Sequence, residues 1–104
     1  MDVYEALADP TRRQIVSMLA AGERSAGDIC SRFPIAGPSV SRHLKVLRES
    51  GLIAYRQRAQ SRLYRLEPEP LEQVRQWMDA QLDLANARFD RLGAHLDAMK
   101  ERGD

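Results

Sequence analysis

The chain has 104 residues, of which 43% are hydrophobic, 30% are charged and one is cysteine, so it is neither a disordered chain nor a disulfide framework. No apolar run approaches the roughly 20 residues that span a bilayer and no signal peptide opens the chain, so we expect one soluble, cytoplasmic domain over residues 1–104 with no membrane partner. The net charge is only +1, but residues 37–66 hold seven basic residues against one acidic residue, a local excess typical of a surface that binds a polyanion.

Two helices are expected at the start of the chain. Apolar residues between positions 3 and 8 indicate a short first helix. Asp9-Pro10 then starts a second helix, because aspartate is a good N-cap and proline suits the first helical position. The second helix is expected to end at Gly22. The apolar side of the first helix consists of Val3, Tyr4, Leu7 and Ala8, and that of the second consists of Ile15, Val16 and Leu19.

Residues 26–50 have the pattern of a helix-turn-helix. Ser25 followed by Asp28 resembles a capping box, so a brief helix is expected to begin there. A turn at residues 34–37 separates this helix from a second one, which occupies residues 38–50. The apolar residues of the brief helix are Ile29, Cys30 and Phe33.

The helix at residues 38–50 is the candidate recognition helix. At about 100° per residue, Val40, Leu44 and Leu47 form one narrow apolar stripe, and hydroxyl and cationic groups lie on the other sides. Such a helix can bind bases and phosphates in a DNA major groove, although an ordinary solvated helix has the same pattern. The residues expected to bind DNA are Ser39, Ser41, Arg42, Lys45 and His43, of which His43 could instead brace the helix.

Residues 52–66 predict a two-stranded β-hairpin, or wing. Two β-prone runs are separated by Ala59-Gln60-Ser61, and their Leu and Tyr side chains would anchor the hairpin to the helices. Arginines projecting from its tip would bind the DNA backbone or minor groove. Arginines at an edge hairpin also prevent aggregation, and that alone would explain two of the three. The wing arginines are Arg56, Arg58 and Arg62.

A long helix is expected over residues 69–101. Its apolar residues recur at spacings of three and four, close to a heptad seam, and a domain this small has no core long enough to cover them. We therefore expect a second copy of the chain to cover the seam, helped by the helix at residues 1–8; a helix folded back on its own domain is the alternative. Gly93 could bend or split the helix. The seam begins with Leu71 and Val74 and ends with Met99, and the expected dimer contacts are Tyr4, Leu7, Met78, Leu82, Ala85, Phe89, Leu92 and Leu96.

Two stretches together resemble the ArsR/SmtB family of bacterial winged-helix repressors, namely LADPTRRQIV at residues 7–16 and PSVSRHLKVLRESGLI at residues 38–53. The resemblance covers residues 3–66 well, and the terminal helix matches only in kind. It implies a mainly α (α+β) winged helix-turn-helix fold of about five helices that dimerises through its terminal helices. It also implies a homodimeric repressor that binds double-stranded operator DNA and often releases it when an effector arrives. The sequence indicates neither the effector nor the operator.

Many members of that family sense metals, but both family metal sites are broken here. The arsenic-type Cys-Val-Cys run falls on Ser25-Ala26-Gly27, which leaves Cys30 as the one remaining thiol. In the zinc site of the terminal helix, Asp83 lacks the histidine two residues on, and His95 is followed by Ala98 instead of a ligand. The resemblance therefore implies the metal-independent, SdpR-like autorepressor branch, with no metal and no cofactor. Cys30 is then a small core residue or a redox-sensing thiol, and His95 a solvated or seam residue.

An enzyme is not expected, because the chain shows no Ser/His/Asp set and no glycine-rich phosphate loop, and it has only two histidines. Two alternatives to a metal-independent repressor stay open. The first is a winged-helix module that binds a protein through the helical seam. Salt dependence distinguishes it, since DNA affinity falls steeply with salt. The second is a repressor with a non-standard metal or redox sensor at Cys30, His95 and the terminal acids.

Overall fold

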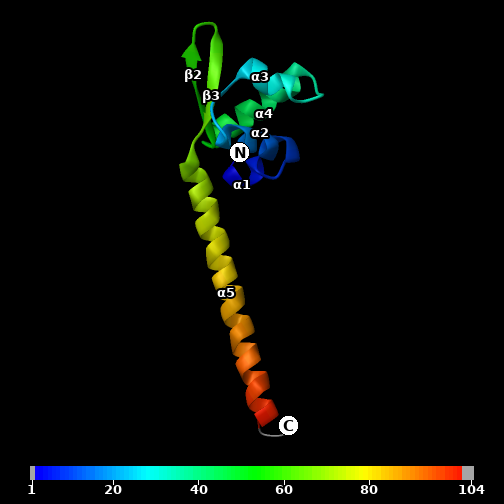
Figure 1. Cartoon of the computed structure of the whole chain (residues 1–104), viewed down its shortest axis with the longest axis vertical. Coiled ribbons are helices and arrows are strands. Elements are labelled where there is room, and N and C mark those ends of the chain that lie inside the picture. The colour runs from blue at the N-terminus through cyan, green and yellow to red at the C-terminus, as the bar shows by residue number, and fades with distance from the viewer. Residues whose placement is uncertain (1, 102–104) are drawn as a thin grey trace. The chain divides into compact units, whose positions relative to one another are not determined.

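The computed structural model describes residues 2–101, so residue 1 and residues 102–104, at the ends of the predicted domain, lie outside the described residues. The chain divides into two compact units, residues 1–74 and residues 75–104. The described part contains five helices and one three-stranded antiparallel sheet (Figure 1). None of its helices combines the length and apolar content that crossing a membrane demands. In chain order the elements are α1 (Val3–Ala6), α2 (Pro10–Ala20), β1 (Arg24–Ser25), α3 (Ala26–Ser31), α4 (Gly37–Glu49), β2 (Ile53–Arg58), β3 (Ser61–Leu66) and α5 (Pro68–Glu101).

The helix ends follow the expected capping residues. Asp9 Oδ2 accepts the backbone N–H of Arg12 at 3.0 Å, which satisfies a donor that the start of α2 leaves open. Ser25 caps α3 in the same way. After α4, Gly51 has a φ of +85°, a left-handed conformation that favours glycine. These predicted boundaries are confirmed, whereas α1 and α3 are shorter than expected.

The apolar stripe of α4 lies at the centre of the core in the first unit. Val40, Leu44 and Leu47 are buried, and they belong to one cluster with the stripe of α2 and with Ile29 of α3. Burying a side chain of this size contributes about 1.5–3 kcal/mol, so the stripe fixes which side of α4 faces outward. The other buried members of the cluster are Ala6, Ile15, Val16, Leu19, Leu52, Ile53 and Tyr64.

The predicted two-stranded hairpin is confirmed as β2 and β3, and a further short strand, β1, extends the sheet. β1 pairs antiparallel with β3, which also pairs with β2, so the strand order is β1-β3-β2. β1 was not predicted, because a strand of two polar residues has no periodicity of its own and is defined only by its partner. Ser61, expected in the turn, pairs with Arg58 and belongs to β3. The turn itself contains Ala59, whose φ is +56°.

α5 is one helix that continues through Gly93 without interruption. Its apolar seam begins in the first unit, where Leu71 packs against the core and Val74 is 9% exposed. Farther along α5, in the second unit, the large seam residues are more than half exposed. These residues are Met78, Leu82, Phe89, Leu92 and Leu96.

Arg12 connects α1, α2 and α4. From α2, its Nε donates to the carbonyl oxygen of Ala6 at 2.7 Å and its Nη2 to that of Glu5 at 3.0 Å. Its Nη1 lies 3.4 Å from Nδ1 of His43 on α4. A helix as short as α1 is not stable by itself, so the hydrogen bonds from Arg12 to its last carbonyls hold it in place.

Replacing Arg12 with methionine should lower the free energy of unfolding by about 1.5–3 kcal/mol, the magnitude typical of hydrogen bonds made by a charged donor. Urea denaturation followed by circular dichroism measures this loss. Arg13→Met is the matched control, because Arg13 donates to the Leu7 carbonyl at 2.8 Å from an exposed position and should cost less. Equal losses in both variants would contradict the larger role of Arg12.

Candidate nucleic-acid interface

α4 has three different sides around its buried stripe. At about 100° per residue, Arg42 lies opposite the stripe, and it is exposed. The two flanks have different surroundings, since one faces a hollow beside β3 and the other faces α2. The predicted DNA-binding residues of this helix therefore do not form one face. The flank beside β3 carries Ser41, Lys45 and Arg48, and the opposite flank carries Ser39 and His43.

His43 is connected to α2. Its Nδ1 lies 3.4 Å from Arg12 Nη1 and 3.9 Å from Asp9 Oδ2. The backbone N–H of Arg12 lowers the pKa of Asp9; burial opposes this effect, and the charges of His43 and Arg12 reinforce it, so Asp9 is ionised at neutral pH. Of the two roles left open for His43, these contacts support bracing, and a contact with phosphate stays a prediction.

A hollow of about 380 Å³ lies between α3, α4 and β3. Lys45 and Arg48 line it from α4, and Arg62 lines it from β3. Lys45 also lies 4.0 Å from Glu49 one turn farther along, an exposed pair of a kind that contributes little to stability. Three cations therefore share one concave surface beside the predicted recognition helix. The other lining residues are Ala26, Cys30, Ser41, Leu44 and Tyr64.

The wing arginines lie on two faces of the hairpin. In the antiparallel register, Arg56 and Arg58 point to one face and Arg62 points to the other. The guanidinium carbon of Arg62 is 4.3 Å from the centroid of the Tyr55 ring. A hydrogen bond with Tyr64, and then the nearby Tyr55, raise the pKa of Arg62, which stays charged. The expectation that all three arginines project from the tip is therefore wrong for Arg62.

Arg56 and Arg58 differ in their surroundings although they share a face. Arg56 Nε donates to Glu23 Oε2 at 3.3 Å in an exposed ion pair. Such a pair is weak, so a phosphate could replace the carboxylate. Arg58 is exposed beside the turn at Ala59. Arg58 is thus the wing arginine that best fits the expected position at the tip.

Arg48 and Tyr55 belong to this surface but were not among the predicted DNA-binding residues. The guanidinium carbon of Arg48 lies 5.4 Å from the centroid of the Tyr55 ring, the same ring that Arg62 contacts. The Tyr55 ring in turn lies 5.5 Å from the Tyr64 ring, between centroids. For Arg48 the signal in the sequence was its position three residues after Lys45, on the same flank of α4. Tyr55 gave no such signal, because its contacts depend on the register of the hairpin.

The described residues contain no group of three or more His, Cys, Asp or Glu side chains placed to hold a metal ion. Cys30 is half-buried, lines the hollow beside α4 and packs against the core, as a small core residue would. His95 is exposed on α5. These two residues therefore stand in different parts of the chain, Cys30 in the first unit and His95 in the second.

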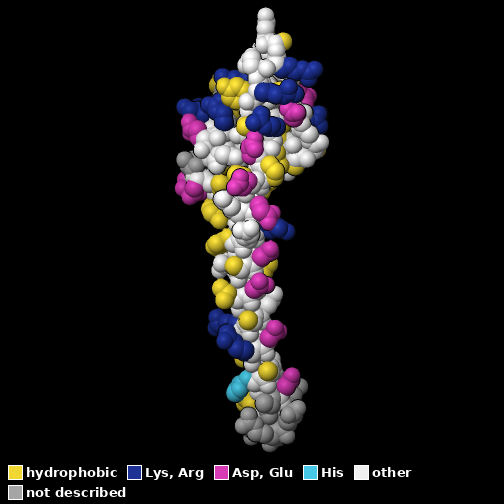
Figure 2. All heavy atoms as spheres, turned by 90° about the vertical axis from the view of Figure 1, so that its left-hand side faces the viewer, with side chains coloured by type: hydrophobic (Ala, Val, Ile, Leu, Met, Phe, Trp, Pro, Cys, Tyr) yellow, Lys and Arg dark blue, Asp and Glu magenta, His cyan; other side chains and the backbone are white. Residues whose placement is uncertain are grey.

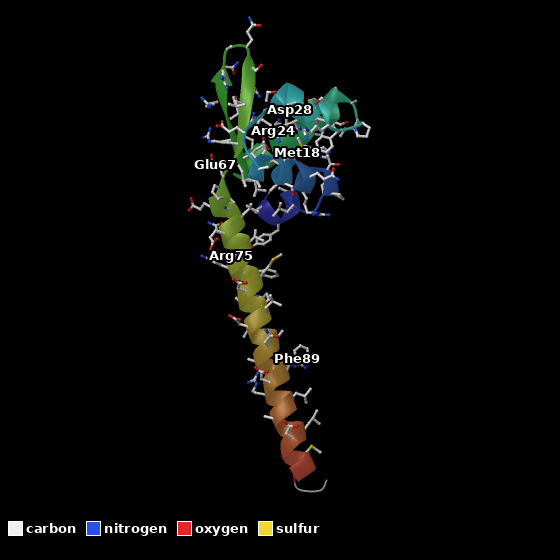
Figure 3. The ribbon with its side chains drawn as sticks, in the orientation of Figure 1. Met18, Arg24, Asp28, Glu67, Arg75 and Phe89 are labelled. Atoms are coloured by element: carbon white, nitrogen blue, oxygen red, sulfur yellow. The ribbon has the colours of Figure 1, made fainter. Side chains whose placement is uncertain are left out.

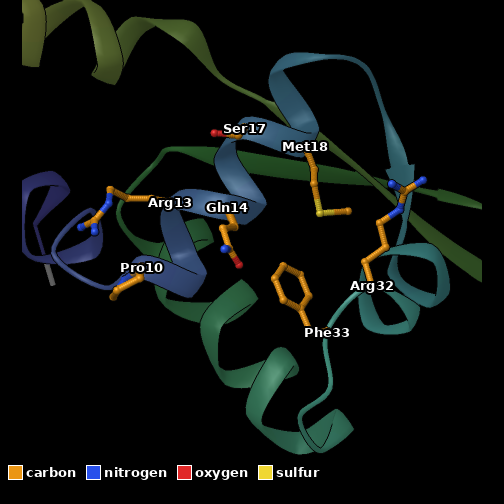
Figure 4. Close-up of a pocket in the computed structure, with 7 residues that line it drawn as sticks. All are labelled: Pro10, Arg13, Gln14, Ser17, Met18, Arg32 and Phe33. Atoms are coloured by element: carbon orange, nitrogen blue, oxygen red, sulfur yellow. The ribbon is translucent and has the colours of Figure 1, made fainter.

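A second hollow, of about 610 Å³, lies between α2 and the segment that follows α3 (Figure 4). The ring of Phe33 points toward Gln14 and Met18 of α2, and Phe33 packs against the core. Phe33 was expected in the helix before the turn, but it lies beyond the end of α3. Its contact with α2 instead anchors the turn that leads into α4. The remaining residues that line this hollow are Pro10, Arg13, Ser17 and Arg32.

The exposed seam of α5 is the candidate dimer interface. Figure 2 shows hydrophobic side chains along one edge of α5 and acidic side chains along another. Phe89 is 68% exposed and points away from the helix axis (Figure 3). The small side chain of Ala85 leaves a hollow of about 290 Å³ that a large apolar side chain could fill. This hollow is lined by Ala85, Arg88, Phe89 and Leu92.

Other apolar side chains are exposed outside the seam. Trp77 and Leu84 are 54% and 67% exposed, and because they are seven residues apart they lie on the same side of α5. The heptad prediction missed them because it followed one stripe only. Two residues near the start of the chain were also expected at the interface. Tyr4 of α1 is 49% exposed, whereas Leu7, the C-cap of α1, is half-buried and packs against the core.

Known proteins are similar to this chain in both sequence and fold. The family model described as "Bacterial regulatory protein, arsR family" matches residues 9–55, from the N-cap of α2 into β2. The transcriptional repressor SdpR of Bacillus subtilis is 38% identical over 77 residues, which cover 74% of this chain and 86% of SdpR. The HTH-type transcriptional regulator Rv2034 of Mycobacterium tuberculosis is 41% identical over 76 residues, which cover 73% of this chain and 71% of that protein. A crystal structure of an ArsR family transcriptional regulator matches with a TM-score of 0.74 and 32% identity, covering 80% of this chain and 86% of that one.

Proposed function

Since the chain belongs to the arsR family of bacterial regulatory proteins, we propose that it represses transcription as a homodimer, with α4 in the major groove of an operator and the wing on the adjacent backbone. As a family member it is a DNA-binding transcriptional regulator. The observation that carries the proposal is the position of Arg42, which faces outward on a helix whose opposite side is fully buried. A buried stripe prevents the helix from rotating, so Arg42 stays directed toward a partner.

The proposal divides DNA binding between helix and wing. Arg42 sits in a rigid helix and can read guanine with two hydrogen bonds, whereas Arg58 stands beside a turn and is assigned to phosphate or the minor groove. The remaining residues proposed to contact DNA are Ser39, Ser41, His43, Lys45, Arg56 and Arg62.

Arg42→Ala should cost about 1–3 kcal/mol per half-site and relax the preference at one operator position. Arg58→Ala should weaken binding to all DNA sequences alike, and it should lower the slope of log affinity against log salt concentration by about one unit. An operator is first selected from random duplexes with the purified protein. Both variants are then titrated by fluorescence anisotropy against the operator and a scrambled duplex across a salt series.

Arg42→Ala and Arg58→Ala together test which residue reads bases and which contacts the DNA backbone. If Arg42→Ala lowers both affinities equally and Arg58→Ala changes the sequence preference, the two roles are reversed. If neither variant alters DNA affinity, the basic surface is a solvated face, and the exposed seam of α5 becomes the candidate site for a protein partner.

The proposed homodimer uses the α5 seam. Its support is a row of large apolar side chains that are more than half exposed, together with the hollow beside Ala85. Exposed apolar rows of this length are unusual on a monomer and mark an interaction surface. A two-fold dimer would also present two copies of α4 to successive half-sites.

Phe89→Glu should convert the dimer to monomer or insoluble chain, because it places a charge in the middle of the seam. Analytical ultracentrifugation measures the mass over a range of concentrations. Ala87→Glu is the matched control, since it adds the same charge two residues away on the exposed side of α5 outside the seam. A Phe89→Glu dimer as stable as the wild type would remove the seam from the interface.

We further propose that repression needs no metal, because Ser25 and Gly27 stand where the arsenic-type site requires cysteines. Operator binding should be unchanged by zinc, cadmium or arsenite below the concentration at which the protein precipitates. Titration of the metal-free protein with each metal, followed by anisotropy with operator DNA, tests this. Tight, stoichiometric metal binding that releases the DNA would contradict the proposal and indicate a site assembled across the dimer.

A further inference from the structure

Arg48 and Arg62 come from different elements and contact the same aromatic ring. Their guanidinium carbons lie 5.4 Å and 4.3 Å from the centroid of Tyr55, Arg48 from the last turn of α4 and Arg62 from β3. Both also line the hollow of about 380 Å³ beside α4. The separation of the two guanidinium carbons cannot exceed the sum of those distances, which is close to the screening length of about 8–10 Å in physiological salt. At such a separation the two positive charges are not fully screened from each other.

No carboxylate compensates this repulsion within the described part of the chain. The ion pairs made by its other arginines, such as that of Arg65 with Glu67 at 3.0 Å, do not extend to Arg48 or Arg62. The nearby Lys45 adds a third positive charge, offset only by Glu49 at 4.0 Å. A ring face attracts each cation but carries no net charge, so Tyr55 positions both arginines and leaves their positive charge unneutralised.

We propose that this hollow is a phosphate site, in which Arg48 and Arg62 together bind a single phosphodiester of the operator backbone. The inference rests on the proposed function and adds Arg48 and Tyr55 to it. A phosphodiester is the anion of choice because arginine offers paired N–H donors that match its oxygens. The flank of α4 that lines the hollow is next to the outward side of Arg42, so a backbone that follows the major groove at Arg42 passes the hollow.

Tyr55 acts as a positioning residue in this site. Its ring holds two long side chains whose ordering would otherwise cost entropy when the phosphate binds. The role needs the ring and not the hydroxyl. Tyr55→Phe should therefore keep DNA affinity, and Tyr55→Leu should lower it for operator and scrambled duplex alike, with an unchanged melting temperature in the Phe variant as the folding control.

The central test compares Arg48→Gln, Arg62→Gln and their double variant with Arg65→Gln. Arg65 is an exposed arginine on the same strand as Arg62, but it points to the other face of the hairpin. Arg65→Gln is therefore the matched control, because it removes the same charge outside the hollow. Each single variant should weaken binding to operator and scrambled DNA by the same factor, about tenfold, as expected for a hydrogen bond to a charged group. The double variant should lower the salt slope by about 0.9, the value for a single phosphate.

The outcomes separate this inference from the proposed function. If Arg48→Gln and Arg62→Gln bind DNA with the same affinity as Arg65→Gln while Arg42→Ala still loses operator affinity, the proposed phosphate site is wrong and the proposed repressor function is unaffected. A decrease of about 1.8 in the salt slope of the double variant would mean that the two arginines bind two separate phosphates, and it would overturn the shared site.

Calorimetry with inorganic phosphate at constant ionic strength should show no saturable binding below millimolar concentration. Tight binding that the double variant abolishes and that releases DNA would instead assign the hollow to a free anion. A wild-type protein that binds no duplex would overturn the proposed function itself.

Discussion

The orientation of α4 depends on the hydrogen bonds that Arg12 makes. Arg12 gives its backbone N–H to the N-cap carboxylate of Asp9 and its side chain to the last carbonyls of α1. The same guanidinium lies against His43 on one flank of α4. One side chain therefore links the start of α2, the end of α1 and the recognition helix. The buried stripe and the contacts of His43 together fix the orientation of α4, with Arg42 directed outward and the hollow on the flank opposite His43.

Residues whose structure depends on their own neighbours in sequence were predicted well. Asp9, Ser25 and Gly51 mark helix ends by local chemistry, and the stripe of Val40, Leu44 and Leu47 follows from a period of 3.6 residues. The sequence also predicted the exposed seam of α5, because a stripe that continues beyond any possible core needs no tertiary information to be recognised.

The features that were missed depend on partners far away in sequence. β1 exists because Arg24 and Ser25 pair with β3, and the faces of the wing arginines follow from a register that Ser61 extends. The juxtaposition of Arg48, Tyr55 and Arg62 needs the crossing of a helix and a hairpin. No periodicity within one element encodes such a crossing, so the candidate phosphate site could be found only from the fold.

The partners of Arg12 and Arg24 differ from those of the two arginines in the proposed phosphate site. Arg12 donates to backbone carbonyls, and Arg24 pairs with Asp28 at 3.3 Å one turn along the chain (Figure 3). Such oxygens occupy the donors that a phosphate would need, and displacing them costs stability. Arg48 and Arg62 both lie over the Tyr55 ring, and Arg62 also has a hydrogen bond with Tyr64. A guanidinium has five N–H donors, so a contact with the ring and one hydrogen bond still leave donors for a phosphate. Tyr55 thus positions Arg48 and Arg62 before binding while they keep the donors that the proposed phosphate site requires.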